Sequence, residues 1–155
     1  MRWLRYAMAG VFVVLLGTSP FRGTDISALV PVEVVWIGLE ESMVHLETDT
    51  GPFGEGRDVS AAIENLKSKA PGKVFLDTAD YLIVEKGREE LLEQLYTILR
   101  PSCMVCCADA VSDLEASVEF LKAHEPKMTL RQWKVENEAL PILAETERGF
   151  AWHEK

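Results

Sequence analysis

Cysteine is scarce in this sequence, and what is missing around its three cysteines excludes most thiol chemistry. An odd number of cysteines cannot form a closed disulfide framework, and Cys103, Cys106 and Cys107 supply only one Cys-x-x-Cys spacing. A structural zinc site would need further ligands, and neither His45 nor His124 has ligand spacing. Strand alternation places Cys103 and Cys107 on one face and Cys106 on the other. We therefore expect three buried free thiols. The alternative is a small exported thiol protein that uses them for redox or metal chemistry.

Basic residues are also scarce. The chain has 16 Lys and Arg against 25 Asp and Glu, which gives a net charge of −9. An acidic surface repels the phosphates of nucleic acids and the anionic head groups of lipids. We therefore expect no nucleic-acid partner and no electrostatic attachment to a membrane surface.

The sequence lacks the motifs of the common catalytic and nucleotide-binding sites. No Ser-His-Asp set, phosphate loop or dinucleotide-binding fingerprint is present. The triplet Asp49-Thr50-Gly51 matches the aspartic-protease motif. That chemistry needs two such carboxylates sharing one proton, so the chain would have to dimerise. A capped turn is the favoured interpretation.

Asp77 and Asp80 flank a short break between two apolar runs. They could form a carboxylate pair for a cation or for acid–base catalysis, but a solvated turn explains them as well, and we favour the turn. We therefore predict no enzymatic activity, no cofactor and no metal site. The alternative is a carboxylate-based hydrolase that uses Asp49 or the pair of Asp77 and Asp80.

No uncharged run reaches the length of about 20 residues that a membrane span needs. Near the N-terminus, Arg2 and Arg5 precede an uncharged and mostly apolar segment, residues 6–17. A basic start followed by a short apolar core is typical of a secretory signal. We assign residues 1–22 to a signal sequence or N-terminal membrane anchor, and residues 23–31 to a linker. The domain would then lie on the extracytoplasmic side and touch the membrane only through this segment.

The remaining sequence predicts a single αβ domain over residues 32–143. Residues 32–48 indicate an antiparallel β-hairpin, because β-branched and apolar residues dominate its first part and alternate with polar ones in its second. Residues 49–56 are rich in glycine and are expected to form a loop. Asp58 is the expected N-cap of a helix that ends before Pro71.

Residues 70–110 then predict a β-α-β unit, in which an amphipathic helix joins two apolar runs. A capping box, Ser112-Asp113-Leu114-Glu115, predicts the next helix. Residues 129–135 alternate like an edge strand, and residues 144–155 are expected to form a polar tail. The predicted fold is α/β (α+β), with a small sheet that begins with the hairpin, and helices packed on it. One core should contain these residues: Ile63, Leu66, Leu92, Leu95, Val105 and Cys107.

The segments VSAAIENL, ADYLIVEKG, LLEQL and MVCCADAVSDLEA occur in the order helix, strand, helix, and strand with helix. With the preceding hairpin and loop, this pattern resembles the N-terminal domain of the Ger(x)C proteins, the C subunits of bacterial spore germinant receptors. The resemblance covers residues 32–124, and the arrangement is also similar to the ring-building modules of sporulation membrane complexes. It implies an envelope assembly module of a spore former and brings no catalytic residues. Thr18 stands where the lipidated cysteine of a lipoprotein would be, so no lipid can be attached there.

Together these observations predict a non-enzymatic, exported or membrane-anchored module that binds protein partners in the cell envelope. The link to sporulation or spore germination comes from the resemblance alone. A homo-oligomer is compatible with the sequence.

Overall fold

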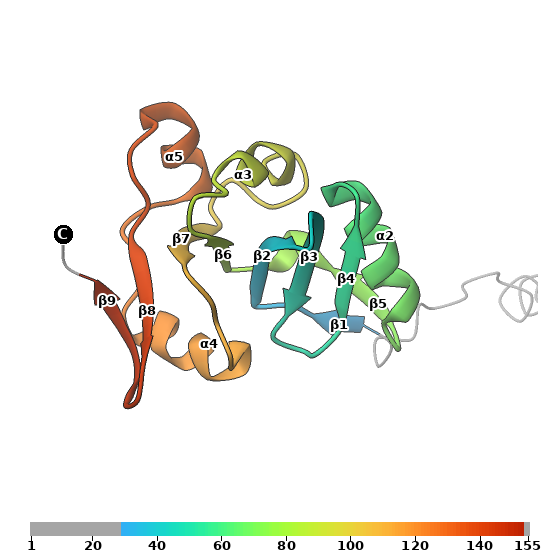
Figure 1. The fold of residues 1–155 in the computed structure, drawn as a ribbon, viewed down its shortest axis with the longest axis horizontal. Helices are drawn as coiled ribbons and strands as arrows, with labels where there is room; N and C mark the ends of the chain where they lie inside the picture. The colour runs from blue at the N-terminus through green and yellow to red at the C-terminus, as the bar shows by residue number, and fades with distance from the viewer. Residues whose placement is uncertain (1–28, 154–155) are drawn as a thin grey trace, which may run out of the picture.

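The computed structural model describes residues 29–153, and the predicted signal or anchor segment lies outside them. Among the described residues, no helix is both long and apolar enough to cross a membrane. Over this range the chain forms a seven-stranded mixed sheet, a small two-stranded sheet and four α-helices that pack against the larger sheet (Figure 1). The predicted α/β fold class is confirmed.

The bounds of the elements are as follows. The larger sheet contains β2 (Val34–Glu40), β3 (Met43–Thr48), β4 (Phe53–Gly56), β6 (Tyr81–Glu85), β7 (Met104–Ala108), β8 (Ile142–Thr146) and β9 (Gly149–His153). The smaller sheet contains β1 (Leu29–Pro31) and β5 (Lys73–Phe75), which pair in parallel. The helices are α2 (Val59–Lys69), α3 (Glu90–Leu95), α4 (Leu114–Ala123) and α5 (Leu130–Glu136), and a short 3-10 helix, η2 (Leu76–Thr78), precedes β6.

The larger sheet has the strand order β4-β3-β2-β6-β7-β8-β9. β2, β6, β7 and β8 run parallel to one another, while β3, β4 and β9 pair antiparallel with their neighbours. The predicted hairpin is the β2–β3 pair, and the predicted β-α-β unit is the β6-α3-β7 crossover. The central strand β6 is buried on both faces from Tyr81 to Val84, because helices lie on each side of it.

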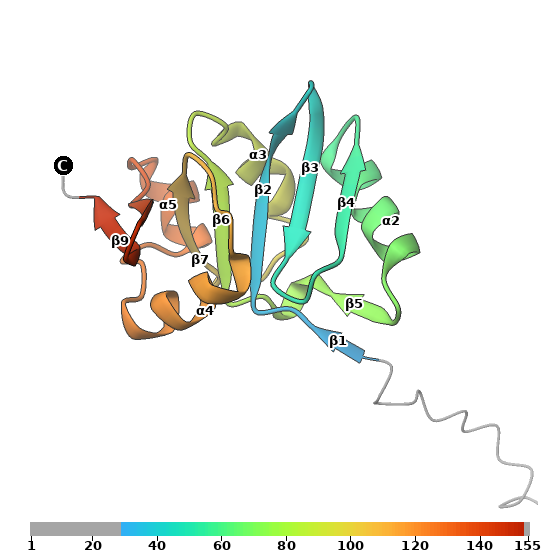
Figure 2. The same ribbon diagram turned by 60° about the horizontal axis from the view of Figure 1, so that its bottom comes forward.

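Two apolar cores lie on opposite faces of this sheet (Figure 2). The larger core is formed with α2, α3 and α5, and the smaller one with α4. The predicted common core is confirmed, since all six of its residues belong to the larger core: Ile63, Leu66, Leu92, Leu95, Val105 and Cys107.

Helix α2 begins as predicted, with the Asp58 side chain accepting a hydrogen bond from the Ala61 N–H at 2.8 Å. Its apolar face lies directly on β4, where the sequence analysis expected only a loop. A Cβ on Gly54 would lie 2.6 Å from the Leu66 Cβ, and one on Gly56 would lie 2.6 Å from the Ala61 carbonyl carbon. The glycines that indicated a loop are therefore strand residues that let the helix approach closely.

The expected edge strand at residues 129–135 is wrong, because this segment contains helix α5. Thr129 and Gln132 form a reciprocal capping box at its start, and Leu130 and Trp133 are buried one helical turn apart. The capping box predicted from Ser112 is also wrong. Asp113 is the N-cap of α4 instead, because the Ser112 N–H and hydroxyl both donate to the Glu145 carboxylate.

The expected polar tail is wrong as well, since residues 144–153 belong to the hairpin of β8 and β9. The Phe150 and Trp152 rings lie 6.2 and 5.8 Å from the Phe120 ring of α4, measured between centroids. The Trp152 indole N–H also donates to the His124 carbonyl at 3.0 Å. At the other end, β1 lies within the expected linker of residues 23–31 and pairs with β5. The domain therefore extends beyond the predicted boundaries at both ends.

Candidate functional site

Among residues 29–153, no helix covers one face of the outer strands β3 and β4. Helix α4 covers the β2–β6–β7 part of this side, and α2 lies on the opposite side, so the outer strands β3 and β4 present an open surface (Figure 2). Strand alternation selects the residues that point to this surface, because their neighbours Ile37, Val44 and Leu46 point into the larger core. We call this surface the acidic sheet face and define it by these residues: Trp36, Glu40, Met43, His45, Glu47, Phe53, Glu55 and Glu85.

The charged side chains of the outer strands have a single sign. Residues 29–56, which contain all three outer strands, include six Asp and Glu residues and no Lys or Arg. Two of the large apolar side chains on the face are also exposed, Met43 at 44% and Phe53 at 42%. Glu85 is held in place, because its Oε2 accepts a hydrogen bond from the Leu39 N–H at 2.7 Å. The face therefore combines exposed apolar groups with carboxylates that lack a basic counterpart on these strands.

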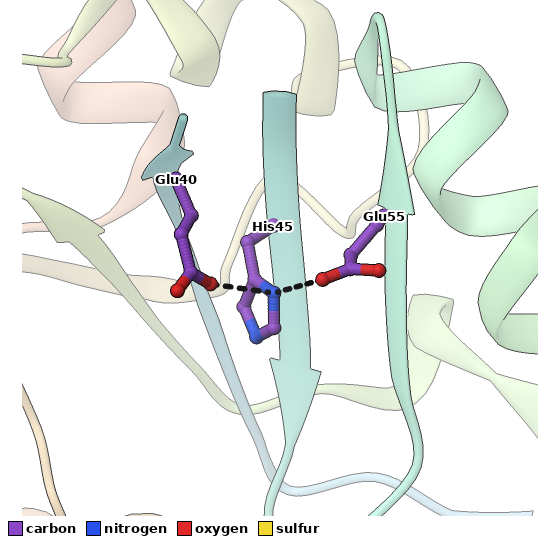
Figure 3. Close-up of side chains that lie close together, drawn as sticks. All are labelled: Glu40, His45 and Glu55. Carbon is purple, nitrogen blue, oxygen red and sulfur yellow. Dashed lines mark ion pairs between the residues drawn. The ribbon is translucent and has the colours of Figure 1, made fainter. Parts of the chain in front are cut away.

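Glu40, His45 and Glu55 meet at the centre of the acidic sheet face, one from each of β2, β3 and β4 (Figure 3). The His45 Nδ1 lies 3.6 Å from the Glu40 Oε2 and 3.6 Å from the Glu55 Oε1. His45 pairs directly with Glu55 across the strands, whereas Glu40 reaches the imidazole diagonally from beyond Gly38. Three side chains with metal-ligating or proton-accepting atoms are thus brought together by strand register alone.

Aromatic side chains hold the His45 ring. Phe53 stacks on it with 5.5 Å between centroids and an interplanar angle of 18°, and Trp36 meets it edge-on at 5.8 Å and 62°. The His45 side chain is only 16% exposed, and within the described residues its Nδ1 has no hydrogen-bond partner. The imidazole is thus fixed in orientation and largely shielded, while its Nδ1 faces the two carboxylates.

Asp49 lies in the turn between β3 and β4, as predicted, but its side chain caps the start of β2 instead of the turn itself. Its Oδ1 accepts hydrogen bonds from the N–H groups of Glu33 and Val34, both at 3.1 Å. Burial raises the pKa of the Asp49 carboxyl, and these two hydrogen bonds oppose the rise. Asp49 also lines an open groove of about 920 Å³ beside the Glu33–Lys122 ion pair. The groove does not include Asp77 or Asp80, so the structure does not join the three aspartates into one site.

Asp77 and Asp80 are both exposed and lie on either side of a turn. Asp77 belongs to η2, where the Thr78 hydroxyl closes the turn by donating to the Phe75 carbonyl at 2.7 Å. Asp80 forms an ion pair with Arg100, whose Nε donates to the Ala79 carbonyl. Asp80 therefore anchors the end of the α3 segment beside β6.

The three cysteines are buried free thiols, as predicted. Cys103 and Cys107 belong to the larger core and Cys106 to the smaller one, so the predicted alternation is confirmed. Burial raises the pKa of Cys103 to about 12 and raises that of Cys106 further. The pKa of Cys107 is also raised, first by burial and then by the nearby Glu89 carboxylate. The thiolate, which is the reactive form, is disfavoured at all three positions.

The sequence analysis missed the cluster of Glu40, His45 and Glu55. No recognised metal-ligand spacing along the chain links His45 to Glu40 or Glu55. The signal was the hairpin register: once β2 and β3 are paired, Glu40 lies two residues beyond the residue opposite His45. Glu55 could not be placed, because the glycine-rich residues 49–56 indicate a loop, whereas they contain strand β4.

Comparison with known proteins gives no significant match to a protein-family model, a curated protein or a solved structure. The functional argument therefore rests on the geometry of this chain.

Proposed function

We propose that the chain is a non-enzymatic binding module, exported or anchored in the membrane by its N-terminal segment, which engages a protein partner of the cell envelope. The acidic sheet face is the contact surface, and the partner presents a basic segment with apolar side chains. The exported location and the sporulation link stay predictions from the N-terminal pattern and from the resemblance to the Ger(x)C domain.

The observation that carries this proposal is the unbalanced charge beside exposed apolar groups. On the acidic sheet face, Glu47 lies in register with Trp36 on one side and with the exposed Phe53 on the other. Within the described residues, Glu47 forms no ion pair, and the only basic side chain placed over this group of rings is Lys69, whose Nζ lies over the Phe53 ring, 4.2 Å from its centroid. Complementary charge favours encounter with a basic partner, while apolar contact area supplies most of the affinity.

The alternatives from the sequence analysis receive less support. The thiol protein needs a reactive cysteine, and all three thiols are buried with a raised pKa. The carboxylate hydrolase needs two carboxylates in one cleft. Asp77 and Asp80 are solvent-exposed at a turn. Asp49 shares its groove with other carboxylates, but its Oδ1 accepts hydrogen bonds from two backbone N–H groups, and the neighbouring Glu33 pairs with Lys122. A binding surface is therefore the better account.

Site-specific photo-crosslinking of the full-length chain in its native cells tests the proposal. A photoreactive residue in place of Phe53 reports on the acidic sheet face, and one in place of Val135 reports on α5, which packs on the opposite side of the sheet. We expect Phe53 to yield a discrete crosslink to a protein with a basic, apolar segment, and Val135 to yield none.

Charge reversal supplies the matched control. Glu47→Lys should abolish the Phe53 crosslink, whereas Glu64→Lys makes the same charge change on the exposed side of α2 and should leave it intact. A crosslink only to a second copy of this chain, or one that survives Glu47→Lys, contradicts the proposed partner. Unchanged thermal unfolding of both variants would show that the fold is preserved.

A further inference from the structure

The cluster of Glu40, His45 and Glu55 has the spacing of a metal centre rather than of a hydrogen-bonded triad. A charge-assisted hydrogen bond from an imidazole to a carboxylate brings nitrogen and oxygen to about 2.7–2.9 Å. Here both distances from the His45 Nδ1 are 3.6 Å. Ligands bound to Zn²⁺ at about 2.0–2.1 Å in a tetrahedron lie about 3.4 Å from one another. The two distances from the imidazole are therefore close to those between ligands of one ion, and all three ligand atoms lie within 4.8 Å of one another.

The environment of the His45 imidazole also fits that of a metal ligand. Its Nδ1 is shielded from solvent and has no hydrogen-bond partner among residues 29–153. A buried nitrogen loses its hydrogen bonds to water, and this costs free energy unless another hydrogen bond or a bound ion replaces them. The nitrogen faces the two carboxylates, and the rings of Trp36 and Phe53 hold the imidazole in this direction.

Among the residues that the structure describes, no cation competes for the two carboxylates. Within the described part of the chain, neither Glu40 nor Glu55 pairs with a lysine or an arginine. Their side chains are 70% and 41% exposed, so an ion can reach them from solvent and can keep water in its remaining positions. The three ligands also come from adjacent paired strands, which fixes their backbones before any ion binds.

We propose that Glu40, His45 and Glu55 bind one divalent transition-metal ion, represented by Zn²⁺, which links strands β2, β3 and β4. One imidazole and two carboxylates suit zinc and its neighbours in the first transition row. Ca²⁺ takes about 6–8 oxygen ligands, and Mg²⁺ requires near-octahedral oxygen geometry, so the imidazole counts against both. The inference stands apart from the proposed partner, because it concerns an ion and these three side chains only.

Calorimetric titration of the metal-stripped full-length chain with ZnCl₂ tests this site. We expect one Zn²⁺ per chain and no comparable binding of Mg²⁺ or Ca²⁺. Even the loss of an outer-shell partner weakens metal affinity about 10–100-fold, so Glu40→Gln, His45→Gln and Glu55→Gln should each weaken Zn²⁺ binding at least about tenfold. Glu40 is exposed enough that its variant is expected to fold normally.

His124→Gln and Glu64→Gln are the matched controls, because they remove the same groups elsewhere on the surface and should bind Zn²⁺ like the unchanged chain. Substitution with Co²⁺ distinguishes this site from the cysteines: the spectrum should show d–d bands without a thiolate charge-transfer band. The proposal is refuted by absence of stoichiometric Zn²⁺ binding, by binding that the three glutamine variants leave unchanged, or by a thiolate band.

Discussion

The buried cysteines make a quantitative prediction about thiol labelling in the folded protein. Only the thiolate reacts, and burial raises the pKa of Cys103 from 9.0 to about 12. At about pH 8, a thiol with a pKa of 9.0 is roughly one-tenth ionised, whereas a thiol with a pKa of about 12 is roughly one ten-thousandth ionised. The thiolate population at Cys103 should therefore be about a thousandfold smaller in the folded chain than in the unfolded chain, and labelling should be correspondingly slow, although the greater nucleophilicity of a high-pKa thiolate offsets part of this factor.

The structure also predicts the order in which the three thiols react. Cys103 and Cys106 are both almost fully buried, but burial raises the pKa of Cys106 beyond that of Cys103, so Cys106 should react last. Cys107 lines a shallow cleft beside Lys86 and Glu89, and its Sγ donates to the Pro141 carbonyl at 3.6 Å. Partial access through this cleft should make Cys107 the first thiol to react.

A chromogenic disulfide reagent at about pH 8 measures these rates, with and without guanidinium chloride, in the unchanged chain and in single Cys→Ala variants. We expect three fast thiols in denaturant. In the native protein, labelling should be slow and should follow the order Cys107, Cys103, Cys106. Fast labelling of Cys103 or Cys106 without denaturant would refute the buried strand and would favour the thiol protein instead.

Three further substitutions test the packing and the capping. Leu95→Ala removes a fully buried side chain from the larger core and should lower the free energy of unfolding by about 2–5 kcal/mol in denaturant titration; no measurable loss would mean that α3 does not pack there. Gly54→Ala forces a Cβ against α2 and should cost about 1–3 kcal/mol in the same assay; a neutral effect would contradict the close helix–strand contact. Asp49→Asn keeps the acceptor for the Val34 N–H. Because the folded pKa of Asp49 is raised above 3.8, its ionisation costs stability as the pH rises through the folded value. The variant should therefore be at least as stable as the unchanged chain in thermal unfolding at pH 7, and Asp49→Ala should lose about 1–3 kcal/mol through unsatisfied backbone donors; a destabilised Asn variant would refute this account.

Local patterns were sufficient to predict much of this fold. The β2–β3 hairpin was predictable because His45 and Glu47 alternate with Val44 and Leu46, and that alternation is the period of a half-buried strand. The burial of the cysteine strand followed from its unbroken apolar sequence, which is typical of a parallel strand covered on both faces.

Where the prediction failed, a tertiary contact decided the local structure. The glycines of β4 allow α2 to pack closely on the strand, and no local sequence pattern indicates this contact. Serine is a favoured N-cap residue, but the β8–β9 hairpin brings Glu145 next to Ser112, which donates its hydrogen bonds to that carboxylate. Asp113 is therefore the N-cap of α4. The cluster around His45 was unpredictable for a related reason, because the pairing of β2, β3 and β4 brings its residues together and their spacing in the sequence does not.

The most direct test of the central claim is hydrogen–deuterium exchange of the full-length chain, alone and in complex with the partner recovered by crosslinking. If the acidic sheet face is the contact surface, peptides from β3 and β4 should gain protection on binding, and those from α5 should not change. Protection confined to α5 or to the exposed side of α2, with β3 and β4 unchanged, would contradict the account.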